Sequence, residues 1–196
     1  MKKVKNILVV FGHTSNKSLC YSFFEQYVAG LKTTYNKVEN LILNEFNFEQ
    51  YLKNSHNQPI KLDKDLLNIQ QKIQWADHLV FIYPTWWAIC PALLKVFFEV
   101  IFAKGFAYEY KKSIGFIPQW NKLLKNKTAS IIVTMDSPRW YYKYVAKDPG
   151  YKMMKDILSF CGIKIVNRYY FGSVKMASKQ KKIKWIQQVY NIGVKE

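Results

Sequence analysis

The sequence predicts an open α/β fold in which a five-stranded parallel sheet with strand order 2-1-3-4-5 lies between two layers of helices. Apolar runs rich in β-branched residues alternate with helical patterns along the 196 residues, which is typical of parallel sheets with right-handed crossovers. The runs at 7–12 (ILVVFG) and 78–83 (HLVFIY) are almost continuously apolar, as expected of strands that helices cover on both faces.

The predicted elements follow one another in a regular order. Strands are expected at residues 7–12, 38–43, 78–83, 128–134 and 163–171, and helices at 19–35, 63–75, from 91 onward, 152–160 and 179–190. The first helix carries apolar residues at four-residue spacing. Pro91 is expected at the first position of the third helix, and Gly162 at the end of the fourth.

Two stretches receive no strand or helix. Residues 44–59 read as a long polar and aromatic connection, and residues 105–120 as an aromatic segment that contains glycine. We find no internal repeat and no linker, so the sequence predicts a single domain over residues 1–196. A chain of this length with 49% hydrophobic residues can bury a substantial core, and such a composition argues against disorder.

No apolar run reaches the roughly 18–20 residues that a membrane span needs, so no integral membrane segment is expected. The N-terminal residues lack the pattern of a cleaved signal peptide, which favours a cytoplasmic location. Cys20, Cys90 and Cys161 form no CxxC pair, and the three histidines are equally dispersed. This spacing indicates neither a disulfide framework nor a metal site.

The formal charge of +17 allows two interpretations. One is attraction to nucleic acid, an anionic membrane or phosphorylated ligands, and the other is simply lysines on a solvated surface. Arg139 and Arg168 are the only arginines, whereas nucleic-acid binders often cluster arginine for bidentate contacts. We therefore favour solvated lysines and expect no nucleic-acid partner, although the field can attract anionic cofactors.

The segment after the first strand is suited to an anion. It leads into a helix N-terminus, where free backbone N–H groups and the helix dipole attract negative charge. Thr14, Ser15 and Ser18 add hydroxyls, and His13 and Lys17 can add positive charge. Neither GxxxxGK[ST] nor GxGxxG is present. Simple helix capping by the serines is an equal alternative if this loop is considered alone.

Two further loops carry aromatic side chains. Trp86 and Trp87 lie on the short loop at 84–90, and Trp140 lies on the loop at 135–144. All three loops follow strands that should end at the same edge of the sheet, where the crossover direction reverses. A phosphate site beside flat aromatic walls describes a flavin nucleotide. The alternative is that the tryptophans fill the core or an interface.

Three stretches carry a resemblance to a known family: ILVVFGHTSNKSLCYSF, ADHLVFIYPTWWAICPALLKVFFEVIFAKGFAYEY and KTASIIVTMDSPRWYY. Over nearly its entire length the chain resembles the flavodoxin-like NAD(P)H:quinone oxidoreductases, which include the quinone reductases and the modulator-of-drug-activity type. The resemblance implies a flavodoxin-like three-layer sandwich and a homodimer whose partner chain completes the flavin site. Residues 105–110 look like the segment that reaches that interface.

The resemblance also implies a reaction. NAD(P)H reduces the flavin, and a quinone or similar flat acceptor then takes the hydride. FAD is the expected cofactor, with FMN as the alternative, and NADH is not distinguished from NADPH. Tyr141, or else Tyr142, is expected to steady the reduced acceptor. The cofactor-binding residues implied by the resemblance and by the loop chemistry are His13, Ser15, Ser18, Leu19, Cys20, Pro84, Thr85, Trp86, Trp87, Ala88, Thr134, Met135, Asp136 and Ser137.

The chain departs from the family pattern at two places. Many relatives have Thr-Thr-Gly-Gly where this chain has Thr-Met-Asp-Ser at 134–137, so the flavin edge is expected to sit differently or to contact Asp136. No histidine follows His78. The Tyr–His relay of the mammalian enzymes is therefore excluded, unless a partner chain supplies His13, His56 or His78.

Three other functions stay open at this point. The first is a one-electron carrier of the flavodoxin kind, although such carriers are usually acidic. The second is an ancillary regulatory flavoprotein of a membrane potassium-efflux system, a role taken by similar proteins. A nucleic-acid-binding module ranks last because of the scarcity of arginine.

Overall fold

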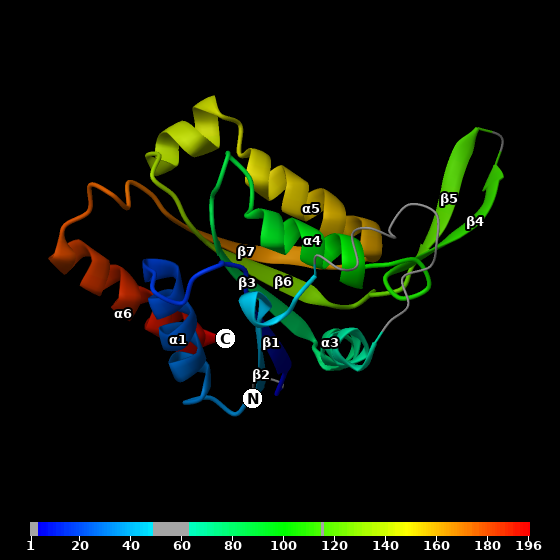
Figure 1. Ribbon diagram of the computed structural model, residues 1–196, viewed down its shortest axis with the longest axis horizontal. Helices are drawn as coiled ribbons and strands as arrows, with labels where there is room; N and C mark the ends of the chain where they lie inside the picture. Colours follow the sequence, from blue (N-terminus) through cyan, green and yellow to red (C-terminus); the bar gives the residue numbers. More distant parts are fainter. Residues whose placement is uncertain (1–3, 49–62, 115) are drawn as a thin grey trace.

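The computed structural model describes residues 4–48, 63–114 and 116–196 (Figure 1). A five-stranded parallel sheet has the strand order β2-β1-β3-β6-β7, which confirms the predicted order 2-1-3-4-5. Its strands are β1 (Asn6–Phe11), β2 (Lys37–Ile42), β3 (His78–Pro84), β6 (Thr128–Thr134) and β7 (Lys164–Phe171).

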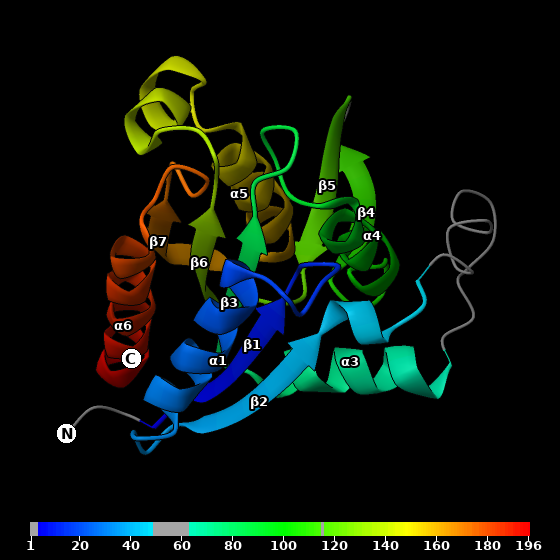
Figure 2. The same cartoon turned by 60° about the vertical axis from the view of Figure 1, so that its left-hand side comes forward.

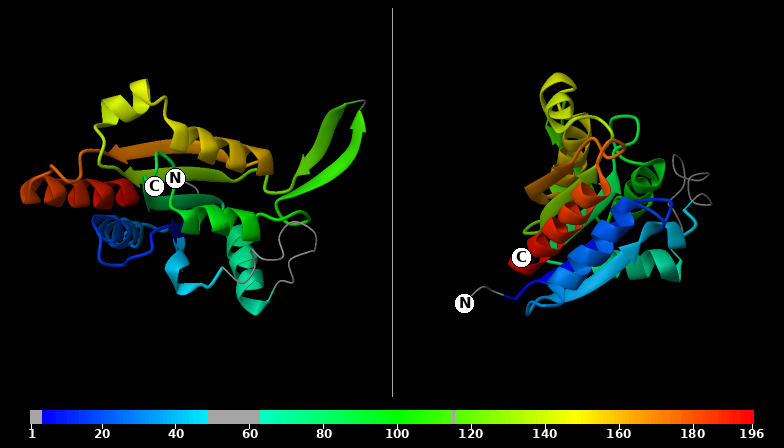
Figure 3. Two further views of the ribbon diagram at one scale, coloured as in Figure 1. Left: turned by 45° about the horizontal axis from the view of Figure 1, so that its top comes forward. Right: turned by 90° about the vertical axis from the view of Figure 1, so that its left-hand side faces the viewer.

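Helices cover both faces of this sheet, as predicted (Figure 2). Side chains alternate along a strand, so Val9 of β1 packs with α1 (Leu19–Leu31) and α6 (Lys179–Lys195), while Leu8 and Val10 face the opposite layer. That layer contains α3 (Lys64–Trp75), α4 (Ala92–Ile101) and α5 (Pro149–Cys161). The helices α1 and α6 lie side by side (Figure 3).

Several helix boundaries differ from the prediction. Helix α1 ends at Leu31 instead of residue 35, because the Thr33 and Thr34 hydroxyls donate to the carbonyls of Gly30 and Leu31. Helices α5 and α6 are longer than predicted. Pro91 precedes α4 as its N-cap instead of opening it. Gly162 ends α5 in the left-handed region with φ of 101°, as predicted.

The segment at 105–120 contains two strands that the sequence analysis did not assign. β4 (Tyr108–Ile114) and β5 (Ile117–Lys122) form a separate antiparallel sheet that projects from the body (Figure 1). Most of its described side chains are exposed or half-buried, so the hairpin lacks the apolar alternation that predicts a half-buried strand. At its base, Trp120 Nε1 donates to the carbonyl of Phe160 at 3.0 Å.

The connection at 44–59 is described only in part. It begins with a short 3₁₀ turn, η1 (Leu43–Glu45), and its remainder from residue 49, including His56, lies outside the described residues. Among the described helices, none is long and apolar enough to cross a membrane.

A buried polar cluster lies at the amino end of β3. His78 is 1% exposed, and its Nδ1 and Nε2 atoms lie 2.7 and 3.0 Å from the hydroxyls of Thr128 and Ser130. The Glu196 carboxylate is 3.6 Å from Nε2. Burial lowers the pKa of His78, and the negative charge of Glu196 offsets this only in part.

This burial predicts an acid-sensitive fold. Because the pKa of His78 is lower in the folded state than its unfolded value of about 6.5, the unfolded chain binds the proton more readily below that pH. The contribution of His78 to the free energy of unfolding should therefore be constant above that pH and fall below it, by up to about 1.4 kcal/mol per pH unit. Urea denaturation between pH 7.5 and 5.5 measures it. His78→Gln should lose most of this slope, and an unchanged slope in that variant would contradict the assignment.

Candidate functional site

The loops that follow β1, β3 and β6 meet at the carboxyl edge of the sheet. The strand order reverses here, and open α/β sheets bind ligands at such points. The Thr85 N–H donates to the Thr134 carbonyl at 2.7 Å and joins two of the loops directly. A pocket of about 180 Å³ opens here. Its lining residues are His13, Ser18, Leu19, Cys20, Pro84, Thr85, Trp86, Thr134, Met135, Asp136 and Val174.

The pocket therefore brings together most of the cofactor-binding residues expected from the sequence. Ser15, Trp87, Ala88 and Ser137 are not among its lining residues. Val174, which follows β7, was not predicted. Its position after a strand of the same sheet was the available signal, but no motif marks it.

The first loop ends in a capped helix. The Ser18 hydroxyl accepts from the Tyr21 N–H at 3.1 Å and donates to the Ser15 carbonyl at 3.2 Å. Capping, the alternative considered from sequence, is thus what Ser18 does. This capping leaves the backbone N–H groups of Leu19 and Cys20 available, because they have no carbonyl partner within the helix. With no acidic residue in the first turn of α1, this helix end remains suited to a phosphate.

His13 links the first loop to the aromatic loop. Its Nδ1 accepts from the Ser15 N–H at 2.8 Å, and its ring meets Trp86 edge-on with centroids 5.2 Å apart. Burial lowers the pKa of His13. The ring is therefore neutral at pH 7, and because Nδ1 is an acceptor, Nε2 carries the proton.

The two adjacent tryptophans differ in exposure because a tight turn runs from Trp86 to Ile89 and places Trp87 at its tip. Trp86 and Ile89 exchange backbone hydrogen bonds at 3.1 and 3.2 Å. Between them, Trp87 and Ala88 have φ of 49° and 66°, a left-handed pair typical of a type I′ turn and costly for residues other than glycine. Trp86 lines the pocket and is 40% exposed, whereas Trp87 is 99% exposed.

A tyrosine holds this strained turn in place. Tyr142 lies on a π-helical turn, η2 (Tyr141–Val145), and is 4% exposed. Its hydroxyl donates to the Ala88 carbonyl at 2.7 Å and accepts from the Gly150 N–H at 2.9 Å. Both bonds are internal, so Tyr142 positions the loop. Tyr141 is 46% exposed and is not among the pocket-lining residues.

The third loop is tied to β7 and to the segment after it by the backbone of Met135. The Met135 N–H donates to Phe171, and its carbonyl accepts from Val174, at 2.9 and 3.1 Å. The Met135 side chain is buried. Asp136 forms an exposed ion pair with Lys175 at 3.3 Å. The negative charge of Asp136 is thus balanced locally.

These groups fit a flavin nucleotide. The free N–H groups at the start of α1 suit a phosphate, and Trp86 offers an aromatic surface beside it. Burial raises the pKa of the Tyr142 hydroxyl, and a hydrogen bond with the buried Thr85 hydroxyl offsets part of this rise, so Thr85 supports the pocket wall from within. Cys20 is buried, and burial raises the pKa of its thiol, so it is not a thiolate nucleophile.

His78, the second of the histidines that the structure describes, lies far from the pocket. His78 begins β3 and Pro84 ends it, so the two are about 20 Å apart at 3.3 Å per residue. His78 is enclosed by its hydroxyl partners and Glu196. It is therefore not accessible to a partner chain either, whereas His13 lines the pocket.

The pocket is not the largest cavity. A groove of about 860 Å³ lies beside the edge strand β7. We assign the candidate site to the smaller pocket because it occupies the point where the strand order reverses and contains the free helix N-terminus.

Removing the Tyr142 hydroxyl should loosen the aromatic loop. Tyr142→Phe leaves the buried Gly150 N–H unpaired, which costs about 1–3 kcal/mol of unfolding free energy. Tyr144→Phe is the matched control, because Tyr144 is 70% exposed and should change stability by less than about 0.5 kcal/mol. Urea denaturation compares the two variants. Equal stabilities would contradict the role assigned to Tyr142.

Comparisons with known proteins agree with this architecture. An "Uncharacterized NAD(P)H oxidoreductase" of Haemophilus influenzae is 32% identical over 143 residues, which cover 68% of this chain and 66% of the relative. "NAD(P)H dehydrogenase [quinone] 1" of Rattus norvegicus is 29% identical over 187 residues, with 83% and 67% covered. The chain thus spans about two-thirds of the length of these curated relatives.

The solved structure of an NAD(P)H:quinone oxidoreductase from Methanothermobacter marburgensis superposes with a TM-score of 0.78 at 22% identity. The superposition covers 98% of each chain, and at this identity it supports the fold alone. The model of the flavodoxin-like fold family matches residues 5–191. With this match over nearly its whole length, the chain belongs to the flavodoxin-like fold family.

Proposed function

We propose that this protein is a flavin-dependent NAD(P)H oxidoreductase that transfers two electrons, as hydride, to a quinone or a similar flat aromatic acceptor. The observation that carries the proposal is the pocket at the strand-order reversal, where the free N-terminus of α1 lies beside Trp86 and Thr134. The names of the relatives in Haemophilus influenzae and Rattus norvegicus, both NAD(P)H oxidoreductases or dehydrogenases, support it.

We propose FAD as the cofactor, with FMN as the alternative. Both share the flavin ring and the first phosphate, and the pocket residues described above suit these shared parts. Mass spectrometry of the cofactor released from purified protein distinguishes the two. The compartment we propose is the cytoplasm, because Cys20, Cys90 and Cys161 are all free thiols.

A bound flavin supplies the hydride chemistry itself. The protein's part is to hold and orient it. The N–H groups of Leu19 and Cys20 would bind the phosphate, and the Nε2–H of the neutral His13 can donate to an anionic oxygen beside them. Trp86 would cover the ring and exclude water. The role of Tyr141 at the acceptor stays a prediction.

The two tryptophans provide an internal comparison for flavin binding. Trp86→Ala removes an aromatic wall of the pocket and should weaken flavin binding roughly tenfold, since aromatic pairs contribute about 0.5–1.5 kcal/mol beyond buried area. Trp87→Ala should leave the affinity unchanged because Trp87 lies outside the pocket. Fluorescence titration of flavin measures both. Equal losses would indicate that Trp87 also contacts the ring.

Activity is tested with purified protein, flavin, NAD(P)H and menadione. We expect menadione-dependent oxidation of NAD(P)H with parallel lines in double-reciprocal plots, because donor and acceptor would use one place in turn. Protein that binds no flavin and oxidises no NAD(P)H would overturn the proposed function.

We also propose a homodimer in which the β4–β5 hairpin contacts the partner. A two-stranded hairpin is marginally stable alone in water, yet this one projects from the body with Tyr110, Phe116 and Ile117 at 55%, 103% and 65% exposure. The pocket of about 180 Å³ is also smaller than the roughly 300–1,000 Å³ of usual ligand sites. A partner chain would enlarge its walls.

The dimer is tested by replacing the exposed apolar residues of the hairpin. Tyr110→Ser combined with Ile117→Ser should shift the mass measured by light scattering from dimer to monomer. Tyr35→Ser and Val4→Ser, which are 94% and 49% exposed on the body, should leave the mass unchanged. A wild-type mass equal to one chain would contradict the proposal.

A further inference from the structure

A basic and aromatic surface lies beside the candidate site and is not used by it. It is formed by Arg139, Trp140, Lys143 and Tyr144 of the segment after β6, and by Met176 and Lys181 of the segment after β7. We call these residues the basic–aromatic surface. They line the groove of about 860 Å³, and no Asp or Glu is among the described residues that line it.

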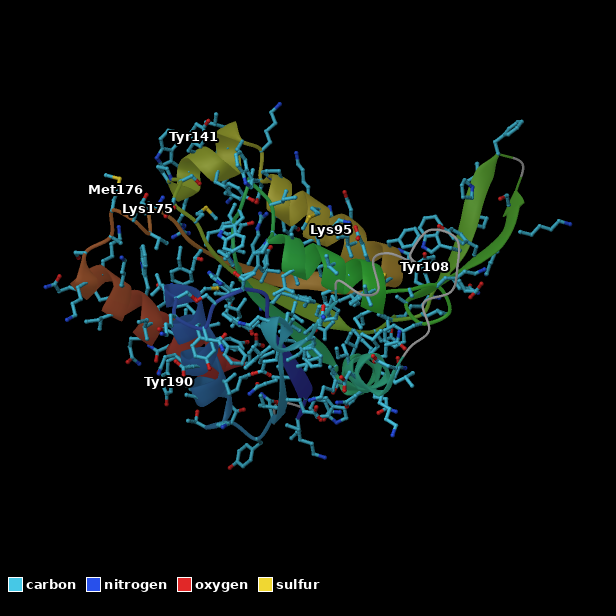
Figure 4. The ribbon with its side chains drawn as sticks, viewed as in Figure 1. Lys95, Tyr108, Tyr141, Lys175, Met176 and Tyr190 are labelled. Atoms are coloured by element: carbon cyan, nitrogen blue, oxygen red, sulfur yellow. The ribbon has the colours of Figure 1, made fainter. Side chains whose placement is uncertain are left out.

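The two segments are held together by backbone contacts. The Ser173 N–H donates to the Ser137 carbonyl at 3.0 Å. A Cβ on Gly172 would lie 2.7 Å from that carbonyl oxygen and 2.8 Å from the Arg139 nitrogen, so glycine is needed for this close approach. Tyr141, Lys175 and Met176 appear at one end of the molecule, far from Tyr108 and the hairpin (Figure 4). The fold therefore fixes the relative position of the two segments that form the surface.

Large apolar side chains of this surface are in contact with solvent. Met176 is 89% exposed, Tyr144 70% and Trp140 62%. Exposed apolar groups in such density mark an interaction site. Their neighbours are cationic: Lys143 lies over the Tyr144 ring at 5.2 Å, and Lys181 over Trp185 at 5.3 Å.

The two segments that form the surface carry an excess of positive charge. Residues 135–147 contain Arg139, Lys143 and Lys147 against Asp136, and residues 172–185 contain five lysines and no Asp or Glu. Asp136 pairs with Lys175, and Asp148 pairs with Arg168 of the groove. The surface therefore suits a partner that is anionic and also accepts Trp, Tyr and Met.

From this combination we propose that the basic–aromatic surface docks on an anionic phospholipid bilayer. Trp and Tyr rings prefer the interface between headgroups and acyl chains, Lys and Arg are attracted to anionic headgroups, and binding to the surface of a bilayer combines both. The groove receives headgroup phosphates between Arg139, Lys143 and Lys181. Since the pocket opens at the same edge of the sheet, and resting here on the proposed function, the acceptor class is a quinone dissolved in that bilayer.

The test is sedimentation of the full-length protein with vesicles of phosphatidylcholine alone or with one-quarter phosphatidylglycerol. We expect binding to the anionic vesicles and loss of it at high salt. The variant Arg139→Gln/Lys143→Gln/Lys181→Gln should reduce partitioning roughly a hundredfold, because each surface cation contributes about fivefold. Trp140→Ser/Tyr144→Ser/Met176→Ser should reduce it as well.

The matched control is Lys122→Gln/Lys125→Gln/Lys155→Gln. It removes the same charge from exposed lysines at the amino-terminal edge of the sheet and should bind the anionic vesicles nearly as the wild type does. Equal losses in both charge variants would mean that net charge alone acts, and would overturn the proposal. So would an absence of vesicle binding, or a fall in the light-scattering mass from two chains to one in the Trp140→Ser/Tyr144→Ser/Met176→Ser variant, which would show that a second copy covers the surface.

Failure of the proposed function gives a different result. Vesicle binding is measured on protein with and without added flavin. A protein that binds vesicles but oxidises no NAD(P)H would support the docking surface and contradict the proposed function. In an active protein, the Arg139/Lys143/Lys181 variant should keep its rate with menadione and lose at least tenfold with a long-chain quinone embedded in anionic vesicles. A variant that keeps the wild-type rate with both menadione and the embedded quinone would contradict the proposed acceptor class.

Discussion

Parallel pairing of β1 with both β2 and β3 is the constraint on which the structure depends. The chain leaves β1 toward β2 on one side and leaves β3 toward β6 on the other side, so a gap opens at the carboxyl edge between β1 and β3. Segments far apart in sequence, at His13, Thr85 and Thr134, enter this gap and form one pocket. The Thr85–Thr134 hydrogen bond keeps two of them in register.

Much of this was predictable because it depends on local patterns. Continuous apolar runs predict buried strands, and alternation with helices predicts their order. The pocket followed from the same reasoning, since only the ends of strands had to be located. What a strand order does not determine is the direction of a side chain on a tight turn. Trp86 and Trp87 are equivalent as sequence, and the left-handed conformation of Trp87 and Ala88 separates them. Tyr141 and Tyr142 are separated by a π-helical turn in the same way.

The features that could not be predicted from the sequence share one physical reason, which is that they lack a local pattern or depend on long-range pairing. The β4–β5 hairpin has no face buried in the core, so its sequence lacks the period that identifies a strand. Lys143 and Lys181, although far apart in sequence, line one groove where α6 and the segment after β6 approach each other, a proximity that exists only after β7 has joined the sheet. The bonds that bind Met135 to Phe171 and Val174 also depend on this long-range pairing.

The Tyr142 hydroxyl has a consequence beyond the turn that it holds. It connects Ala88 to Gly150 at the start of α5, and the other end of that helix carries Phe160, whose ring stacks on Trp120 at the base of the hairpin. Pocket and hairpin thus share one rigid helix. A ligand that favours one arrangement of the turn acts on the hairpin through this helix, and such coupling is reciprocal. In the proposed homodimer, cofactor binding and subunit assembly would then be thermodynamically linked: protein without cofactor would dissociate more readily, and dilution would weaken the binding of cofactor.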